Sequence, residues 1–373
     1  MTTHKTFNIL ILGASYGSLL AIKLLAAGHH VTMTCRSSTA ALINDQGIRV
    51  RLPIKARKDL GNNGLLEIDS RQLNGKLVAS TPQLVENLAG FDLVVLAMQE
   101  PQYRQDGIRE LMTAIAAAGL PCMPIMNMPP LPYLERLKAY HPSLDLTACR
   151  VAYADPSIWD GFDAELMTLS SPDPQAFRPI DEPVNVLQVA LPTNFKVARF
   201  ASSQHTAMLQ QLDADIEAIR YNAASAGNPA DWVELPVKLK VFDSLFVPLA
   251  KWSMLLTGNY RCVQAQTVRP IREAILQDME ASQNVYEWVA GLCVALGATL
   301  GDLVPFDKYA QAADGLAKPS SAARALLAGA VHIERVDLLV QTLATQLKMS
   351  HASVDETVAL VNSWLVKNRS ATA

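Results

Sequence analysis

Apolar runs in the first half of the chain alternate with segments of helical period. Continuously apolar stretches such as Phe7–Leu12 and Phe91–Met98 are typical of strands buried on both faces. Segments such as Leu19–Ala27 and Arg109–Ala118 carry apolar residues at helical spacing. Strands that alternate with helices predict a parallel, doubly wound sheet. The other predicted strands are His30–Arg36, Gly47–Pro53, Gly64–Asp69, Leu77–Thr81 and Pro124–Asn127.

The pattern changes near residue 200. Residues 140–200 contain many Pro and Asp residues and two short β-like runs, which we interpret as sheet edge and connection. Beyond them, long amphipathic segments separated by Gly or Pro predict helices. These segments are Met208–Ala224, Val237–Leu256, Ile271–Leu296 and Ile333–Lys348. The predicted fold class is therefore α/β, with an N-terminal Rossmann domain over residues 1–200 and a mostly helical domain over residues 201–373.

A small-residue turn, Gly13-Ala14-Ser15-Tyr16-Gly17, follows the first predicted strand and opens a helix. It approximates the dinucleotide fingerprint G-x-G-x-x-G, with Ser15 at the second glycine and a spacing one residue short. It also matches G-x-S-x-G, the nucleophile elbow of α/β-hydrolases. An elbow needs several strands and an oxyanion loop before it, whereas this turn sits on the first strand. We therefore expect these five residues to bind a dinucleotide; a serine hydrolase and a turn without a ligand are the alternatives.

Arg36 ends the second predicted strand, about 20 positions after the glycines. NAD-binding chains usually carry Asp or Glu near this point, for the ribose hydroxyls. Arg36, followed by Ser37 and Ser38, instead favours a 2′-phosphate. The predicted cofactor is NADP(H).

Composition narrows the function classes. Of 373 residues, 50% are hydrophobic and 18% charged, and the net charge of −3 gives no basic surface for nucleic acid or an anionic membrane. The five cysteines are scattered without a C-x-x-C pair, so neither a disulfide framework nor a metal site is expected. The sequence has no signal-peptide pattern and no run of about 18 apolar residues. We expect a cytoplasmic protein without a membrane span.

Two segments of the first half resemble the ketopantoate reductase family. Leu96-Ala97-Met98-Gln99 is similar to the family's lysine-x-x-glutamine segment, with Gln99 kept and Leu96 in place of the lysine. Ile125-Met126-Asn127-Met128 is similar to its asparagine-glycine segment, with Met128 in place of the glycine. In the family this asparagine lies beside nicotinamide and substrate. The resemblance implies that Gln99 contacts the cofactor and Asn127 the reacting carbonyl.

Three segments of the second half extend the resemblance. The helix from Leu249 to Asn259 resembles the family's catalytic-lysine helix, with Lys251 and Asn259 kept and Leu255 in place of an asparagine. Pro319-Ser320-Ser321 resembles the substrate-binding serine segment. The short acidic segment from Glu334 to Asp337 resembles the motif of the substrate-binding glutamate, with two extra residues.

The resemblance implies an NADPH-dependent reductase of a 2-keto acid or related carbonyl compound. In this interpretation Lys251 donates the proton, Asn127 polarises the carbonyl, and Asn259, Ser321 and Glu334 hold the substrate, with Glu334 facing a hydroxyl or amine. The expected binding partner is a small-molecule carbonyl substrate, whose identity stays open. A homodimer is compatible with the resemblance. A non-catalytic NADP-binding protein is a second hypothesis, which the changes at Leu96 and Leu255 would suit.

Each site residue also has a plainer interpretation. Lys251 would be a surface lysine, Asn127 a turn residue and Ser321 the N-cap of a helix. Glu334 would pair with Arg335 or Lys348 in solvent. His332 is an alternative proton donor.

Overall fold

The computed structural model describes residues 5–54, 64–85, 87–222 and 232–372. The chain forms two compact units. Unit 1 comprises Met1–Met98, Gln105–Met126 and Gly161–Asp243, and unit 2 comprises Gln99–Arg104, Asn127–Asp160 and Ser244–Ala373. The units thus divide the chain differently from the single boundary at residue 200 that the sequence suggests.

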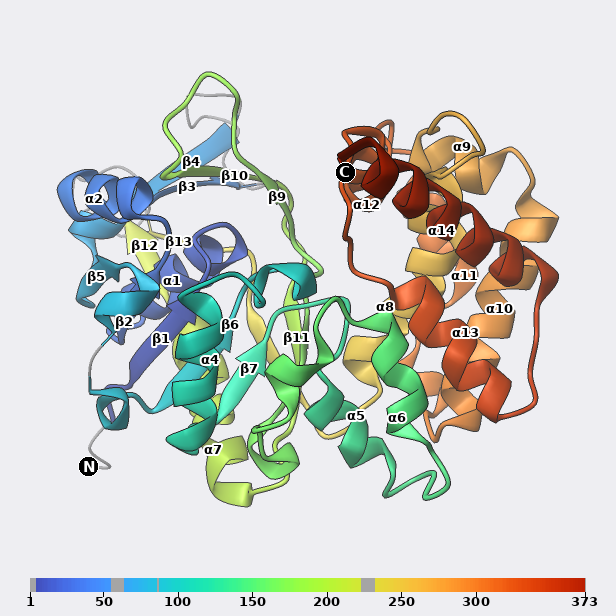
Figure 1. The fold of residues 1–373 in the computed structure, drawn as a ribbon. Coiled ribbons are helices and arrows are strands. Elements are labelled where there is room, and N and C mark those ends of the chain that lie inside the picture. The colour runs from blue at the N-terminus through green and yellow to red at the C-terminus, as the bar shows by residue number, and fades with distance from the viewer. Residues whose placement is uncertain (1–4, 55–63, 86, 223–231, 373) are drawn as a thin grey trace. The chain divides into compact units, whose positions relative to one another are not determined.

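Unit 1 is built on a five-stranded sheet in the order β5-β2-β1-β6-β7, in which every neighbouring pair is parallel. This confirms the doubly wound sheet. Figure 1 shows β1 inside the sheet, between β2 and β6. The strand order reverses at β1, and in open α/β sheets such a switch point is where ligands bind. The strands are β1 (Asn8–Leu12), β2 (His30–Thr34), β5 (Leu77–Ser80), β6 (Leu93–Leu96) and β7 (Cys122–Pro124).

The first helix of unit 1 is almost completely buried. In α1 (Tyr16–Ala26) every residue from Gly17 to Leu25 is buried, including Lys23, whose ammonium donates a hydrogen bond to the Pro236 carbonyl. Burial among apolar groups lowers the pKa of Lys23 well below its usual value. The other helices of unit 1 are α2 (Ser37–Gln46), α4 (Ile108–Ala117) and α7 (Ser203–Glu217).

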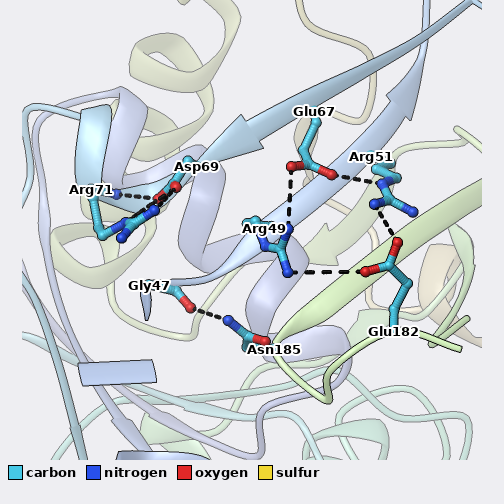
Figure 2. A network of polar contacts seen from close by, with 8 residues as sticks. All are labelled: Gly47, Arg49, Arg51, Glu67, Asp69, Arg71, Glu182 and Asn185. Atoms are coloured by element: carbon cyan, nitrogen blue, oxygen red, sulfur yellow. Dashed lines mark hydrogen bonds and ion pairs between the residues drawn. The ribbon is translucent and has the colours of Figure 1, made fainter. Parts of the chain in front are cut away.

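A second sheet of unit 1 has the order β4-β3-β10-β9. Figure 2 shows the polar contacts on it: Glu182 contacts Arg51 at 2.6 Å and Arg49 at 4.0 Å, and Asn185 donates to the Gly47 carbonyl at 2.8 Å. These contacts tie the connection between β9 and β10 to β3 and to the end of α2. The strands are β3 (Arg49–Pro53), β4 (Leu65–Asp69), β9 (Gln175–Phe177) and β10 (Val186–Leu191).

The helix predicted over Val237–Leu256 is wrong in its first part. Leu239–Phe242 forms strand β14, which pairs in parallel with β11 (Phe195–Ala198) in the sheet β14-β11-β8. Pairing with β11 overrides the local helical pattern, and Pro248 marks where the helical part begins, at Val247. The remaining strands are β8 (Ser170–Ser171), β12 (Arg220–Asn222) and β13 (Trp232–Glu234).

Most of unit 2 is helical, which confirms a helical C-terminal part. The predicted helix Ile271–Leu296 is two helices, because Asp278 accepts a hydrogen bond from the Ala281 amide and caps a new start. In the described chain, no helix combines the length and apolar character that crossing a membrane requires. The helices are α5 (Leu131–Leu137), α6 (Leu146–Cys149), α8 (Lys251–Met254), α9 (Ile271–Leu276), α10 (Met279–Ala295), α11 (Phe306–Ala313), α12 (Ser321–Leu327), α13 (Val336–Gln346) and α14 (Ala352–Thr372).

The packing of α1 on β1 predicts a stability difference between two identical substitutions. A Cβ at Gly17 would lie 2.6 Å from Ile11 Cγ2, whereas a Cβ at Gly291, inside α10, would meet nothing within 4 Å. We expect Gly17→Ala to lower the free energy of unfolding by about 1–3 kcal/mol through overpacking. Gly291→Ala should raise it by roughly 0.5–1 kcal/mol, because alanine loses less entropy in a helix. Denaturant midpoints that move in the same direction for both variants would contradict this packing.

Candidate active site

The turn after β1 brings backbone atoms very close together. Gly13 has φ +105°, and a Cβ there would lie 2.7 Å from the Ala97 carbonyl oxygen and 2.6 Å from Met98 Cγ. Only glycine fits this conformation and this approach to the end of β6. Gly17, the second residue of α1, allows the helix to pack on Ile11. These are the roles that the first and third glycines play in a dinucleotide fingerprint.

The N-terminus of α1 suits a phosphate. Ser15 is exposed at the N-cap position, and among the described residues no side chain caps this end of the helix. Its backbone N–H groups and helix dipole favour an anion there. The exposed Ser15 side chain leaves the backbone accessible, as the second glycine of the fingerprint would. The turn therefore fits the pyrophosphate of a dinucleotide.

Arg36 is exposed just beyond β2 and is the residue before α2. This is the strand end at which nucleotide-binding chains contact the adenosine ribose. Arg36 therefore lies where it could contact a phosphate on the 2′ position of that ribose. Its guanidinium group offers several hydrogen-bond donors to phosphate oxygens.

Unit 2 contains a small pocket of about 40 Å³. Five of the residues that the sequence singles out line it, although they come from widely separated parts of the chain. The full lining is Gln99, Asn127, Leu255, Asn259, Tyr260, Ser321, Ala322, Ala325, Ile333 and Glu334. The fold of unit 2 thus gathers the predicted substrate residues, together with Gln99, at one place.

A π-helical turn over Leu255–Asn259 follows α8 and forms one wall of the pocket. Such widened turns are frequent at functional sites. Side chains bind a carbonyl at each end of this turn: Tyr309 donates to Met254 O, just before the turn, at 2.9 Å, and Ser320 donates to Asn259 O at 2.7 Å. Gly258 is required here, since a Cβ would lie 2.2 Å from the Tyr309 hydroxyl.

Glu334 and Asn127 contact each other in the pocket. Asn127 Nδ2 donates to Glu334 Oε2 at 3.5 Å, and the Glu100 amide donates to Oε1 at 3.3 Å. Asn127 Oδ1 is buried and has no hydrogen-bond partner in the described part of the chain. A buried acceptor without a partner is costly, so a ligand that brings a donor would be stabilised here.

A second carboxyl, Glu100, lies beside Glu334. It is 3% exposed, and its side chain accepts hydrogen bonds from the Ala154 amide. Burial raises the pKa of Glu100 to about 7. Burial, with a contribution from the charge of Glu100, also raises the pKa of Glu334 to about 7. The sequence analysis missed Glu100; an acidic residue directly after Gln99 and before Pro101 was the available signal.

Two of the plainer interpretations are wrong. Arg335 pairs with Asp337, not Glu334, at 2.9 Å. Ser320 caps α12, accepting from the Ala323 amide at 3.1 Å, which leaves Ser321 as a helical residue that lines the pocket. Asn127 lies at a bend, as its plainer interpretation has it, and it also lines the pocket.

Lys251 lies outside the pocket lining, one turn before Leu255 on the same helix, and is only partly buried. Its charge lowers the pKa of Glu334, so the two groups interact electrostatically. His332 also lies outside the lining, and burial lowers its pKa.

Comparisons with known proteins agree with this fold. No family model matches the chain, and no curated protein matches its sequence. Its structure is similar to 2-dehydropantoate 2-reductase from Methylococcus capsulatus, with a TM-score of 0.61 and 12% identity over 97% of both chains. It is also similar to D-mandelate dehydrogenase solved with NADH and anilino(oxo)acetate, with a TM-score of 0.60 and 11% identity over 97% of this chain and 99% of that one.

A third solved structure is a dimeric ketopantoate reductase from Staphylococcus aureus, with a TM-score of 0.58 and 10% identity over 97% of this chain and 99% of that one. The chain therefore has a dehydrogenase-like architecture with a Rossmann sheet and a helical part. More narrowly, it has the ketopantoate reductase fold.

The two raised carboxyl pKa values predict a pH dependence of stability. Between about pH 4.5 and 7 the folded chain keeps protons that the unfolded chain releases, so the free energy of unfolding should fall as pH rises through this range. Glu334→Gln and Glu100→Gln should each reduce that fall, because glutamine does not titrate. Thermal unfolding between pH 5 and 8 measures the effect, with the exposed Glu135→Gln as control. A slope unchanged in both site variants would contradict the assigned shifts.

The exposed position of Ser15 predicts that its hydroxyl is dispensable. Ser15→Gly should leave the Kd for NADPH near that of the original chain, because the backbone stays accessible. Gly13→Ala should weaken binding strongly, since its Cβ would meet the Ala97 carbonyl. Fluorescence titration measures both, and unfolding midpoints separate lost binding from lost folding. An esterase activity that disappears in Ser15→Gly would support the hydrolase instead.

Proposed function

We propose that the protein is an NADPH-dependent reductase of a 2-keto acid or a related carbonyl compound. The observation that carries this proposal is the pocket of unit 2, in which Asn127, Asn259, Ser321 and Glu334 meet. The similarity to 2-dehydropantoate 2-reductase and D-mandelate dehydrogenase supports the same class of chemistry.

Amide, hydroxyl and carboxyl groups in the pocket can bind the polar groups of such a substrate. The Asn127 side chain would polarise the carbonyl oxygen, and the Lys251 ammonium would donate a proton to that oxygen. Asn259 and Ser321 would hold the rest of the substrate. Because Glu334 has a raised pKa, a fraction of it is protonated near pH 7 and can donate as well as accept. It would face a hydroxyl or an amine of the substrate.

The cofactor in this proposal is NADP(H), held by the turn from Gly13 to Gly17 and by Arg36. When bound, it supplies the hydride. A guanidinium at the end of β2 would bind the 2′-phosphate through charge-assisted hydrogen bonds, whereas NAD(H) offers only a hydroxyl there. Leu96, where the lysine of ketopantoate reductases would stand, is fully buried in β6 and offers no charge to the cofactor.

A protein that binds NADP(H) without turnover is the second candidate. Leu255 favours it, because this apolar side chain lines the pocket where ketopantoate reductases carry an asparagine. A panel of 2-keto acids tested with NADPH and with NADH distinguishes the two. Oxidation of NADPH by at least one compound supports the reductase; tight NADPH binding without turnover on any compound supports the second candidate.

On the compound that gives turnover, we expect Lys251→Ala to lower kcat by about 10²–10⁴-fold, the usual range for removal of a general acid. The affinity for NADPH should stay nearly unchanged. Lys308→Ala, in the exposed face of α11, is the matched control and should leave kcat unchanged. Steady-state kinetics measure kcat. If Lys251→Ala retains the original rate, the proton comes from another group, and His332 is the next residue to substitute.

A further inference from the structure

Arg178 contacts the turn from Gly13 to Gly17, although it is far from this turn in the sequence. It directly follows β9, and its Nη2 donates to the Ala14 carbonyl oxygen at 3.0 Å. The same oxygen accepts a hydrogen bond from the Ser18 hydroxyl at 2.6 Å, which holds this peptide in place. A peptide's C=O and N–H point in opposite directions when the bond is trans. Arg178 is therefore on the other side of this peptide from the Ser15 N–H.

Arg178 and Arg36 interact electrostatically. Burial and then the nearby charge of Arg36 lower the pKa of Arg178, whereas Cys35, between the end of β2 and Arg36, acts in the opposite direction. In the described ranges, no carboxylate forms an ion pair with either arginine. Two guanidinium groups that repel each other without an acidic partner form a region that a phosphate dianion would neutralise.

The segment that carries Arg178 is anchored to the helix that follows Arg36. Arg36 precedes α2, and Gly47 ends it. At the far end of the segment, Asn185 donates to the Gly47 carbonyl at 2.8 Å, and Glu182 pairs with Arg51, which also pairs with Glu67 (Figure 2). The connection from β9 to β10 is therefore bound at its far end to β3 and to the end of α2, and at Arg178 to the Ala14 carbonyl. This holds Arg178 near Arg36 before any ligand binds, which reduces the entropy lost on binding.

We propose that Arg178 and Arg36 together bind the 2′-phosphate of NADP(H), so that Arg178 is a second residue that determines cofactor specificity. This inference rests on the proposed NADP(H) cofactor. The end of β2 is where nucleotide-binding chains contact the adenosine ribose, and two arginines can bind the phosphate from two sides.

Binding of nucleotide fragments tests the proposal without turnover. The probes are 2′,5′-ADP, which carries the 2′-phosphate, and 5′-AMP, which lacks it, titrated into the full chain by calorimetry; NADPH and NADH are titrated by fluorescence. Arg178→Ala should weaken 2′,5′-ADP and NADPH by about 10- to 100-fold, as expected for lost charge-assisted hydrogen bonds. Affinities for 5′-AMP and NADH should be nearly unchanged. The affinity of Arg178→Lys for 2′,5′-ADP should lie between those of the original chain and Arg178→Ala, because lysine keeps the charge and loses the bidentate geometry.

The matched control is Arg71→Ala, since Arg71 pairs with Asp69 on the second sheet and should not affect any probe. The double variant Arg36→Ala/Arg178→Ala should lose less than the product of the two single losses, because both arginines bind one phosphate. Thermal unfolding of each variant checks folding, and Arg178→Lys keeps the test valid if Arg178→Ala does not fold.

Two results with the variants would overturn the inference. One is equal weakening of NADPH and NADH by Arg178→Ala, which would assign Arg178 to the shared part of the cofactor or to the fold. The other is unchanged binding of 2′,5′-ADP in Arg178→Ala while Arg36→Ala loses it, which leaves the proposed cofactor intact. If the original chain binds NADH more tightly than NADPH, the proposed cofactor fails, and this inference fails with it.

Discussion

The pocket of unit 2 depends on how the π-helical turn at Leu255–Asn259 is held. The hydroxyls of Tyr309 and Ser320 donate hydrogen bonds to a carbonyl just before this turn and to the carbonyl of its last residue, Asn259. Ser320 also caps α12, so a single hydroxyl connects the widened turn to the start of the next pocket helix. Asn259 and Ser321 reach the same pocket because of this bond. The geometry of the site therefore depends on residues that would themselves contact no substrate.

The burial of two acidic side chains determines the chemistry of the pocket. Glu100 is held by the Ala154 amide, its own amide faces Glu334, and both carboxyls have pKa values raised to about 7. Near neutral pH the pair can therefore exchange one proton with a ligand without a large change in free energy. Asn127 adds an acceptor without a described partner. Such a pocket suits a small ligand that both donates and accepts hydrogen bonds.

The sequence predicted the parts of the fold in which local pattern and tertiary structure agree. The buried strands of the parallel sheet and the glycine turn are examples, because continuous apolar runs and a required glycine leave little choice. It failed at Leu239–Phe242, where pairing with β11 decides the structure, and at Asp278, where a cap divides one helical pattern into two helices.

The same contrast holds in the candidate site. Most of the proposed substrate residues came from motif resemblance, and the structure gathers Asn127, Asn259, Ser321 and Glu334 in one pocket. Glu100 and Arg178 escaped the analysis because their importance arises from burial and from a contact across the chain. No local spacing carries that information.

The division into two units constrains how the chain can be made. Its path crosses between them after residues 98, 104, 126, 160 and 243, so neither unit is a continuous stretch. During synthesis the segment Asn127–Asp160 emerges long before the helices with which it forms unit 2. Tyr133, which is buried, donates a hydrogen bond to the Leu245 carbonyl, so this contact can form only after that later segment has been synthesised. A fragment cut at a single point would leave both products with incomplete units, so unit 1 cannot be obtained by a single truncation.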